Sequence, residues 1–273
     1  MSTGGATTVS AQVDPAYPGG PSAVSPVEPA ELTTTFTNDG KVPATSVRTS
    51  MAVPDGRTAT AVSSPTNNNV GNSRSFTTTW SVTAPRGVDP ASYAFSATTS
   101  YLWDDGTRNG RASGSTKVLV VAPLPIGSSQ LGDDAWTSAG SGWGPVERNQ
   151  SNGEQAAADG KPLTIQEATF AKGLRTHADS EVVYHMGQAF STATTKVSVD
   201  DEAGDSHGNV GVFQMWTDDH KVADSVPVSA SDAARTLTAD VSGARFLRIV
   251  VNKGNDGMSF DHADRADALI TCC

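Results

Sequence analysis

Four segments of the chain hold most of the tryptophan, histidine and carboxylate side chains that do not follow a clear strand pattern. They cover residues 136–149, 172–181, 200–205 and 255–264. Each is rich in glycine or aspartate, which is typical of loops, and binding residues concentrate in loops that a rigid framework positions. We therefore predict that these segments are loops and that they carry the function.

Their residue types suit two kinds of ligand. An aromatic ring can stack on the apolar face of a sugar while His, Asp, Asn and Arg reach its hydroxyl groups. Clustered carboxylate and carbonyl oxygens also suit Ca²⁺, which takes six to eight oxygen ligands. Structural roles compete with both: Trp136 is expected in the core, while Trp143, His177 and the run Asp200-Asp201-Glu202 are open between binding and structural roles.

Signatures of catalysis are absent from the sequence. It contains no Gly-x-Ser-x-Gly elbow, no His-Glu-x-x-His and no phosphate-binding glycine loop. No sustained helical periodicity supports a (β/α)₈ barrel. We therefore expect a protein without its own catalytic site, the alternative being an enzyme with an unrecognised site on a β-sandwich.

The charge composition of the chain indicates which classes of binding partner to expect. The 273 residues are 37% hydrophobic and 18% charged, with a net charge of −10. Such an acidic chain repels nucleic acid and anionic membrane surfaces, so we expect neither as a partner. Up to Ala122 there are 8 basic and 8 acidic residues, against 11 and 21 afterwards, so the acidity belongs to the second part. A bound cation or solvated carboxylates would account for it.

The cysteines and the N-terminus say little about the compartment. Cys272 and Cys273 are adjacent and have no upstream partner, so no disulfide framework is expected. No apolar run is long enough to cross a membrane, and residues 1–5 show no signal-peptide pattern. If the parent protein is secreted, we expect this chain to be an excised part of it.

The elements that must position the four segments are β-strands. Apolar residues alternate in several early segments, as in Phe76-Thr-Thr-Thr-Trp80, with turn residues between them. This pattern predicts an immunoglobulin-like β-sandwich over residues 1–122. Residues 123–130 have the prolines and small polar residues of a linker. In residues 131–273 several strands are apolar on both faces, which predicts a jelly-roll β-sandwich.

At the level of motifs, the second part resembles a known family of sugar-binding modules. Four runs occur in the family's order: Trp143-Gly-Pro-Val-Glu-Arg-Asn, Phe170-Ala-Lys-Gly with Thr176-His-Ala, Val199-Asp-Asp-Glu, and Asp261-His-Ala-Asp. They resemble the NPCBM (family 51) carbohydrate-binding modules. The first part, with Thr79-Trp-Ser-Val-Thr-Ala-Pro85, is similar to the NEW3 domain that accompanies such modules in actinobacterial α-galactosidases.

The resemblance implies an all-β pair of accessory modules from a secreted bacterial glycoside hydrolase such as an α-galactosidase. It implies a galactose-binding-like jelly-roll for terminal galactose or related sugars, a catalytic domain as partner, an extracellular location and a structural Ca²⁺. By position, Trp143, Glu147, His177, Asp261 and His262 become candidates for the sugar site, and Asp200 and Asp201 for the metal.

Two positions depart from the family's pattern. Arg175 stands where the family usually has glycine, and Arg265 where it usually has tryptophan. A lost ring would remove stacking, although a guanidinium can also stack on a ligand. The alternative function is therefore a structural spacer joined to a module that has lost its sugar affinity.

Overall fold

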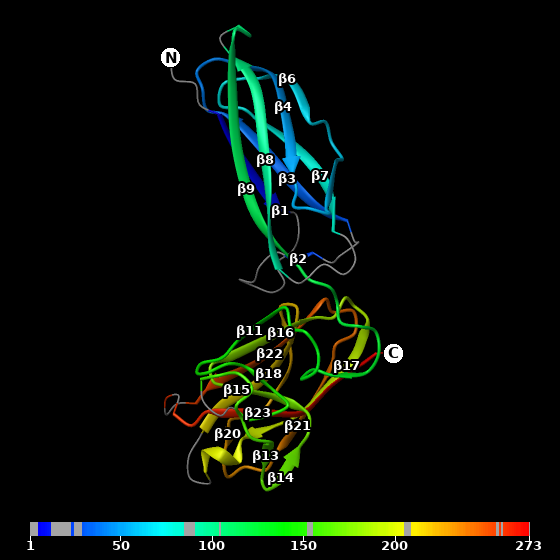
Figure 1. The fold of residues 1–273 in the computed structure, drawn as a ribbon, viewed down its shortest axis with the longest axis vertical. Coiled ribbons are helices and arrows are strands. Elements are labelled where there is room, and N and C mark those ends of the chain that lie inside the picture. The colour runs from blue at the N-terminus through cyan, green and yellow to red at the C-terminus, as the bar shows by residue number, and fades with distance from the viewer. Residues whose placement is uncertain are drawn as a thin grey trace. The chain divides into compact units, whose positions relative to one another are not determined.

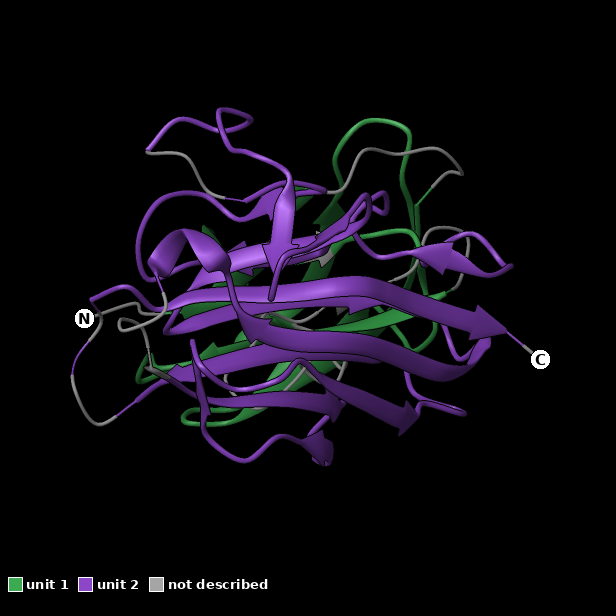
Figure 2. Ribbon diagram, turned by 90° about the horizontal axis from the view of Figure 1, so that it is seen from below, with its two compact units in different colours: residues 1–122 green, residues 123–273 purple. Residues whose placement is uncertain are grey.

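The computed structural model describes residues 5–11, 23–24, 29–84, 91–103, 105–151, 155–204, 209–254, 257 and 259–272. The chain divides into two compact units, residues 1–122 and 123–273, which are coloured separately in Figure 2. Each is described by itself. The described residues form strands and one short 3₁₀ turn, and none of them forms a helix long and apolar enough to cross a membrane.

The first unit is a sandwich of two sheets, in the orders β1-β3-β7-β5 and β2-β9-β8-β4-β6. All its pairings are antiparallel except that of β2 with β9. This agrees with the predicted immunoglobulin-like fold. The strands are β1 Gly5–Ala11, β2 Ala23–Val24, β3 Ala30–Asn38, β4 Ala44–Ala52, β5 Thr58–Ala61, β6 Thr66–Val70, β7 Ser75–Thr83, β8 Ala91–Trp103 and β9 Arg108–Val120.

Period-two alternation builds the core of this unit. In β3 and β7 every second side chain is buried, which places Leu32, Phe36 and Trp80 between the sheets. Trp80 is therefore a core residue, and its indole N–H donates to the Oγ1 of Thr34 at 3.0 Å. Buried threonine hydroxyl groups on the inner faces form hydrogen bonds with one another; the Oγ1–H of Thr7 donates to the Oγ1 of Thr99 at 3.0 Å.

The second unit is a jelly-roll sandwich of two antiparallel sheets, β12-β15-β23-β17-β21 and β11-β16-β22-β18-β19 (Figure 1). From β15 to β18 successive strands alternate between the sheets, and β21 to β23 alternate again. The elements are β10 Ser129–Gln130, β11 Ser138–Gly140, β12 Glu147–Arg148, β13 Leu163–Ile165, β14 Ala168–Phe170, β15 Gly173–His177, β16 Ser180–His185, β17 Phe190–Val199, the 3₁₀ turn η1 Asp201–Ala203, β18 Asn209–Thr217, β19 His220–Asp224, β20 Val228–Ser229, β21 Arg235–Asp240, β22 Phe246–Lys253 and β23 His262–Cys272.

Three of the four segments predicted as loops contain strands, which corrects the sequence-based assignment. Residues 136–149 include β11 and β12, residues 173–177 form β15, and His262 begins β23. All five residues of β15 are buried, because this strand is covered on both faces. Its sequence therefore lacks the alternation of apolar and polar residues by which a half-buried strand is recognised. Asp205, Asn255 and Asp256 of the predicted loops lie outside the described residues.

The segment that joins the two sandwiches in sequence packs on the second one. The side chain of Leu124 is buried in the core of the second unit, and the N–H of Leu124 donates to the carbonyl of His185 at 2.8 Å. Residues 129–130 form β10, which pairs with β23. At the same end of β23, Cys272 is a partly exposed free thiol, and Cys273 lies outside the described residues.

Candidate functional site

A hollow of about 400 Å³ opens where the loop before β12 meets the ends of β15 and β23. Trp143 comes from the loop between β11 and β12. His177 ends β15 and His262 begins β23, and the two histidines are direct partners in the sheet register. The hollow is lined by Gly142, Trp143, His177, Ser259, Phe260 and His262.

Its aromatic rings form a continuous row. The Trp143 and His177 ring centroids are 6.1 Å apart at 62°, and those of His177 and His262 are 5.7 Å apart at 60°. Both are edge-to-face arrangements, which aromatic rings prefer. Trp143 is 38% exposed and Phe260 49%, although large aromatic residues are usually buried. The hollow therefore offers apolar ring surface beside imidazole nitrogens that can form hydrogen bonds.

Two hydrogen bonds attach the Trp143 loop to β15, and a third lies within the loop. The Oγ of Ser141 accepts from the His177 N–H at 2.9 Å and donates to the Trp143 carbonyl at 3.0 Å. The Gly142 N–H donates to the His177 carbonyl at 2.9 Å. These bonds fix Trp143 relative to the histidine pair.

Replacing Gly142 with alanine should loosen this attachment, because a Cβ there would collide with the Ala178 carbonyl oxygen. Backbone atoms cannot turn aside as a side chain can, so we expect the loop to move and ligand affinity to fall roughly tenfold. Gly140→Ala is the matched control, since a Cβ at Gly140 meets nothing within 4 Å. Equal affinity of the two variants, measured by calorimetric titration, would contradict the expectation.

The histidines of the hollow are held in their neutral form. Burial lowers the pKa of His177, and its hydrogen bond to the Ala178 carbonyl opposes that shift only in part. Burial, with a contribution from the positive charge of Arg175, lowers the pKa of His262 to about 4. At neutral pH each ring therefore has one donor and one acceptor nitrogen. The Nδ1–H of His177 donates to the Ala178 carbonyl, which leaves the Nε2 of that ring as an acceptor.

The depressed pKa of His262 makes the module less stable in mild acid. The unfolded chain takes up a proton near pH 6.5 and the folded chain only near 4, so between these values the free energy of unfolding falls as the pH falls. Asp264, whose pKa is raised, contributes in the opposite sense, so the His262 effect is isolated by comparison with His262→Gln. We expect wild type to lose stability relative to this variant from pH 6.5 to 4. An NMR titration in which the His262 ring titrates near 6.5 would refute this.

Two predicted sugar ligands do not line the hollow. The carboxylate of Glu147 is buried on β12, where it accepts from the Ala158 N–H at 3.1 Å and the Gln150 side chain at 2.8 Å. Asp261 is 0% exposed although it lies between two residues that line the hollow. The prediction that these carboxylates contact the ligand directly is not supported by this geometry, because position in a motif does not reveal which way a side chain points.

The predicted metal residues act within the protein. Asp200 accepts from the Glu202 N–H at 2.8 Å and caps η1, and its second oxygen accepts from the Thr164 N–H at 3.4 Å. Asp201 accepts from the N–H groups of Gln166 and Glu167 at 2.7 and 2.8 Å. Both carboxylates therefore hold the hairpin formed by β13 and β14.

Arg175 and Arg265 lie away from the surface of the hollow. Both are 0% exposed, so neither guanidinium can stack on a ligand there. Arg265 points between the sheets and donates to the Oγ1 of Thr176 at 2.9 Å. Arg175 points to the outer face of the β15–β23 sheet.

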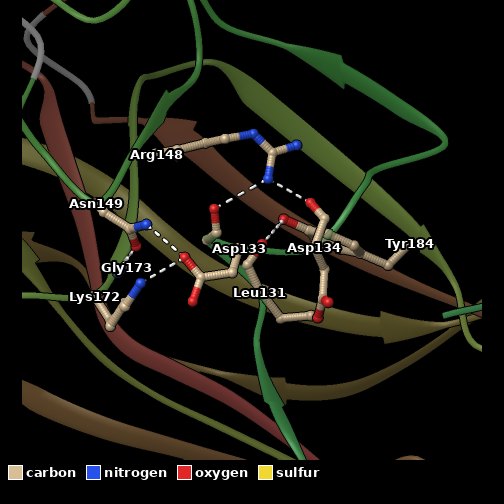
Figure 3. Close-up of polar contacts among 9 residues, drawn as sticks. Leu131, Asp133, Asp134, Arg148, Asn149, Lys172, Gly173 and Tyr184 are labelled. Atoms are coloured by element: carbon tan, nitrogen blue, oxygen red, sulfur yellow. Dashed lines mark hydrogen bonds and ion pairs between the residues drawn. The ribbon is translucent and has the colours of Figure 1, made fainter. Parts of the chain in front are cut away.

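A second polar network anchors the strands that carry the site (Figure 3). The Arg148 guanidinium donates to the carbonyls of Gly132, at 3.0 Å, and of Asp134, and stacks 3.5 Å above the Trp136 ring. Asp133 accepts from Asn149 at 2.7 Å and from Lys172 at 2.6 Å. Trp136 is thus a partly buried structural residue, and the motif after Trp143 joins β12 to the start of β15.

Sequence reasoning missed Gly142, Ser259 and Phe260 as lining residues. A phenylalanine in a glycine- and aspartate-rich segment is a signal that could have found Phe260, because it has no strand neighbours to bury it. In the structure it has a positive φ of 67°, which turns the chain just before β23.

The second unit is thus a jelly-roll β-sandwich with an aromatic hollow at the ends of its strands. The NPCBM/NEW2 domain model matches residues 127–271, more than half of the chain, and the NEW3 model, described as the NPCBM-associated domain of alpha-galactosidase, matches residues 24–101. The chain belongs to the NPCBM/NEW2 domain family of carbohydrate-binding modules.

Three of the known proteins that are similar to this chain each align with a different fraction of it. A Renibacterium salmoninarum protein named "Putative endo-alpha-N-acetylgalactosaminidase" is 31% identical over 224 residues, which are 81% of this chain and 14% of that protein. A CBM51 module from Clostridium perfringens GH95, solved with methyl-galactose, is 29% identical over 53% of this chain and 99% of its own, with a TM-score of 0.46. The CBM51-2 and INT domains of Clostridium perfringens ZmpB, solved with GlcNAc, are 22% identical over 92% of this chain and 46% of their own, with a TM-score of 0.48.

Proposed function

We propose that the hollow binds a terminal galactose or a related sugar at the end of a glycan chain. The observation that carries the proposal is the row of rings formed by exposed Trp143, His177 and His262, in a hollow that exposed Phe260 also lines. The apolar face of a pyranose stacks on an aromatic ring, and neutral imidazoles exchange hydrogen bonds with its hydroxyl groups. The volume of about 400 Å³ suits a small ligand rather than a long chain.

Membership of the NPCBM family, the name of one relative and the description of the NEW3 model support the galactose class. One relative carries the name of an endo-α-N-acetylgalactosaminidase, and the matching NEW3 model is described from alpha-galactosidase. Both names refer to sugars with the galactose configuration. We propose that this chain shares that preference.

The two units then serve as an accessory region of a larger extracellular glycoside hydrolase. The chain spans 14% of the length of the matched relative, so the catalytic domain lies elsewhere in the parent protein in this proposal. Binding keeps that catalytic domain at galactose-bearing glycans and raises its local substrate concentration.

Isothermal titration of residues 1–273 with methyl α-galactoside, N-acetylgalactosamine and N-acetylglucosamine tests the proposal, each in CaCl₂ and in EDTA. We expect the first two sugars to release heat and the third to bind more weakly. If no galactose-type sugar binds in either buffer, the spacer interpretation replaces this one. Hydrolysis of an aryl galactoside by this chain alone would instead show a catalytic site.

A further inference from the structure

Beside the hollow, the outer face of the same sheet carries a layer of buried polar side chains. Glu147, Arg175 and Asp264 are successive partners across β12, β15 and β23, and Ser198 of β17 pairs with Asp264. Residues opposite each other in neighbouring strands project to one face. All four are at most 3% exposed.

A hairpin and a turn cover this layer. Leu163 and Ile165 of β13 are buried, and the hairpin is held by Asp200 and Asp201 as described above. Glu202 of η1 accepts from the Oγ of Ser151 at 2.7 Å and pairs with Lys161 at 3.1 Å. The layer is therefore enclosed by the protein and shielded from water.

Within the layer Arg175 is the central positive charge. Among the described residues its three guanidinium nitrogens have no hydrogen-bond partner, although they are buried. The charges of Asp264, Asp200, Glu202 and Glu147 all stabilise its protonated form against burial. The guanidinium is thus surrounded by acidic side chains at Coulombic range.

Two of the acidic side chains, Asp264 and Asp200, lie close together. The Asp264 carboxyl is 0% exposed and lies within hydrogen-bonding reach of Asp200. Burial raises the pKa of Asp264 well above its usual range, and the charge of Asp200 raises it further. Protonation of Asp264 and the positive charge of the Arg175 guanidinium therefore reduce the negative charge of the layer.

This arrangement does not fit a Ca²⁺ ion. In the part of the chain that the structure describes, no group of three or more His, Cys, Asp or Glu side chains is placed to hold a metal. The oxygens of Asp200 and Asp201 accept backbone N–H groups, and Ca²⁺ requires six to eight oxygen ligands. A cation beside them would also be repelled by the buried charge of Arg175.

We infer that Arg175 is the built-in counter-cation of the layer formed by Glu147, Asp200, Glu202 and Asp264, so that this module folds without a divalent cation. A fixed guanidinium supplies the positive charge that a bound ion would otherwise provide. The inference does not depend on the proposed sugar specificity.

Calorimetric unfolding of the full chain in CaCl₂, MgCl₂ and EDTA tests the inference. We expect the wild-type midpoint to be the same in all three. Arg175→Met should lower the midpoint by roughly 10 °C in EDTA, because removing one partner of a buried charge cluster leaves the others uncompensated. Arg235→Met, which removes a partly exposed ion pair with Asp232, is the control and should shift the midpoint little.

Glu147→Gln separates charge balance from packing, because Glu147 is the register partner of Arg175 and its charge stabilises the guanidinium. If Arg175 acts by charge, adding Glu147→Gln to Arg175→Met should recover part of the lost midpoint; if Arg175 only fills space, it should not. A wild-type midpoint raised specifically by CaCl₂, or no recovery in the double variant, would overturn the inference. If Arg175→Met does not fold, the inference is still tested by the wild-type midpoints in CaCl₂, MgCl₂ and EDTA and by whether the double variant regains a folded state. A lack of sugar binding in the titrations above leaves these outcomes unaffected.

Discussion

Replacing Trp143 with alanine is expected to remove most of the sugar affinity, by roughly 30- to 100-fold. Trp143 is the exposed ring at one edge of the hollow, and its neighbours His177 and His262 form the rest of the row. A tryptophan that anchors a ligand typically contributes 2 kcal/mol or more, and each 1.4 kcal/mol corresponds to about a tenfold change in Kd. Titration of the variant with the sugar that binds wild type most tightly measures the loss.

Trp216→Ala is the matched control for this experiment. Trp216 lies on β18 in the other sheet, where its indole N–H donates to the Gln214 side chain at 2.8 Å, and it does not line the hollow. Its loss should leave the affinity unchanged. If both tryptophan variants bind as wild type does, the hollow is not the sugar site.

Arg265→Ala is expected to destabilise the second unit by roughly 3–5 kcal/mol. Arg265 is 0% exposed and lies between the sheets, 5.6 Å from the centre of the Phe213 ring. Burial lowers its pKa to about 10, so it stays charged at neutral pH. Alanine leaves a large cavity and removes the hydrogen bonds to Thr176 and Ser180. Denaturant unfolding followed by tryptophan fluorescence measures the change.

Arg265→Met separates the volume of this side chain from its charge. Methionine fills most of the same space without a charge, and buried ion sites often tolerate such a replacement. Thr176 and Ser180 keep their mutual hydrogen bond of 2.7 Å. We expect the methionine variant to lose less than about 1.5 kcal/mol. A loss equal to that of alanine would show that the charge, rather than the packing, holds the sheets together.

Much of the fold could be predicted because apolar and polar residues alternate along its strands. In the first unit Leu32, Phe36 and Trp80 stand at period two, which fixes both the strands and their inner faces. In the second unit β18 and β22 were expected from apolar runs and are present. The predicted all-β architecture, a sandwich followed by a jelly-roll, is confirmed.

The site was predicted less completely, for a physical reason. Trp143, His177 and His262 come together, whereas Glu147 and Asp201 hold neighbouring loops. A carboxylate that accepts backbone N–H groups and one that faces a ligand have the same sequence signature, because both follow strands and precede turns. The direction of a side chain depends on register, and the register here is set by pairings between residues as distant as Arg175 and Asp264.

The position of β23 determines when the module can take shape during synthesis. This strand, residues 262–272, lies between β15 and β17 in its sheet and carries His262 at its start. Until it has left the ribosome, β15 and β17 lack the partner that joins them, so a nascent chain ending before β23 has neither a closed sandwich nor a complete hollow. The first unit ends at residue 122 and is compact by itself, so its folding can begin earlier. Folding of the second unit is completed only after translation of β23, and the hollow is complete only then.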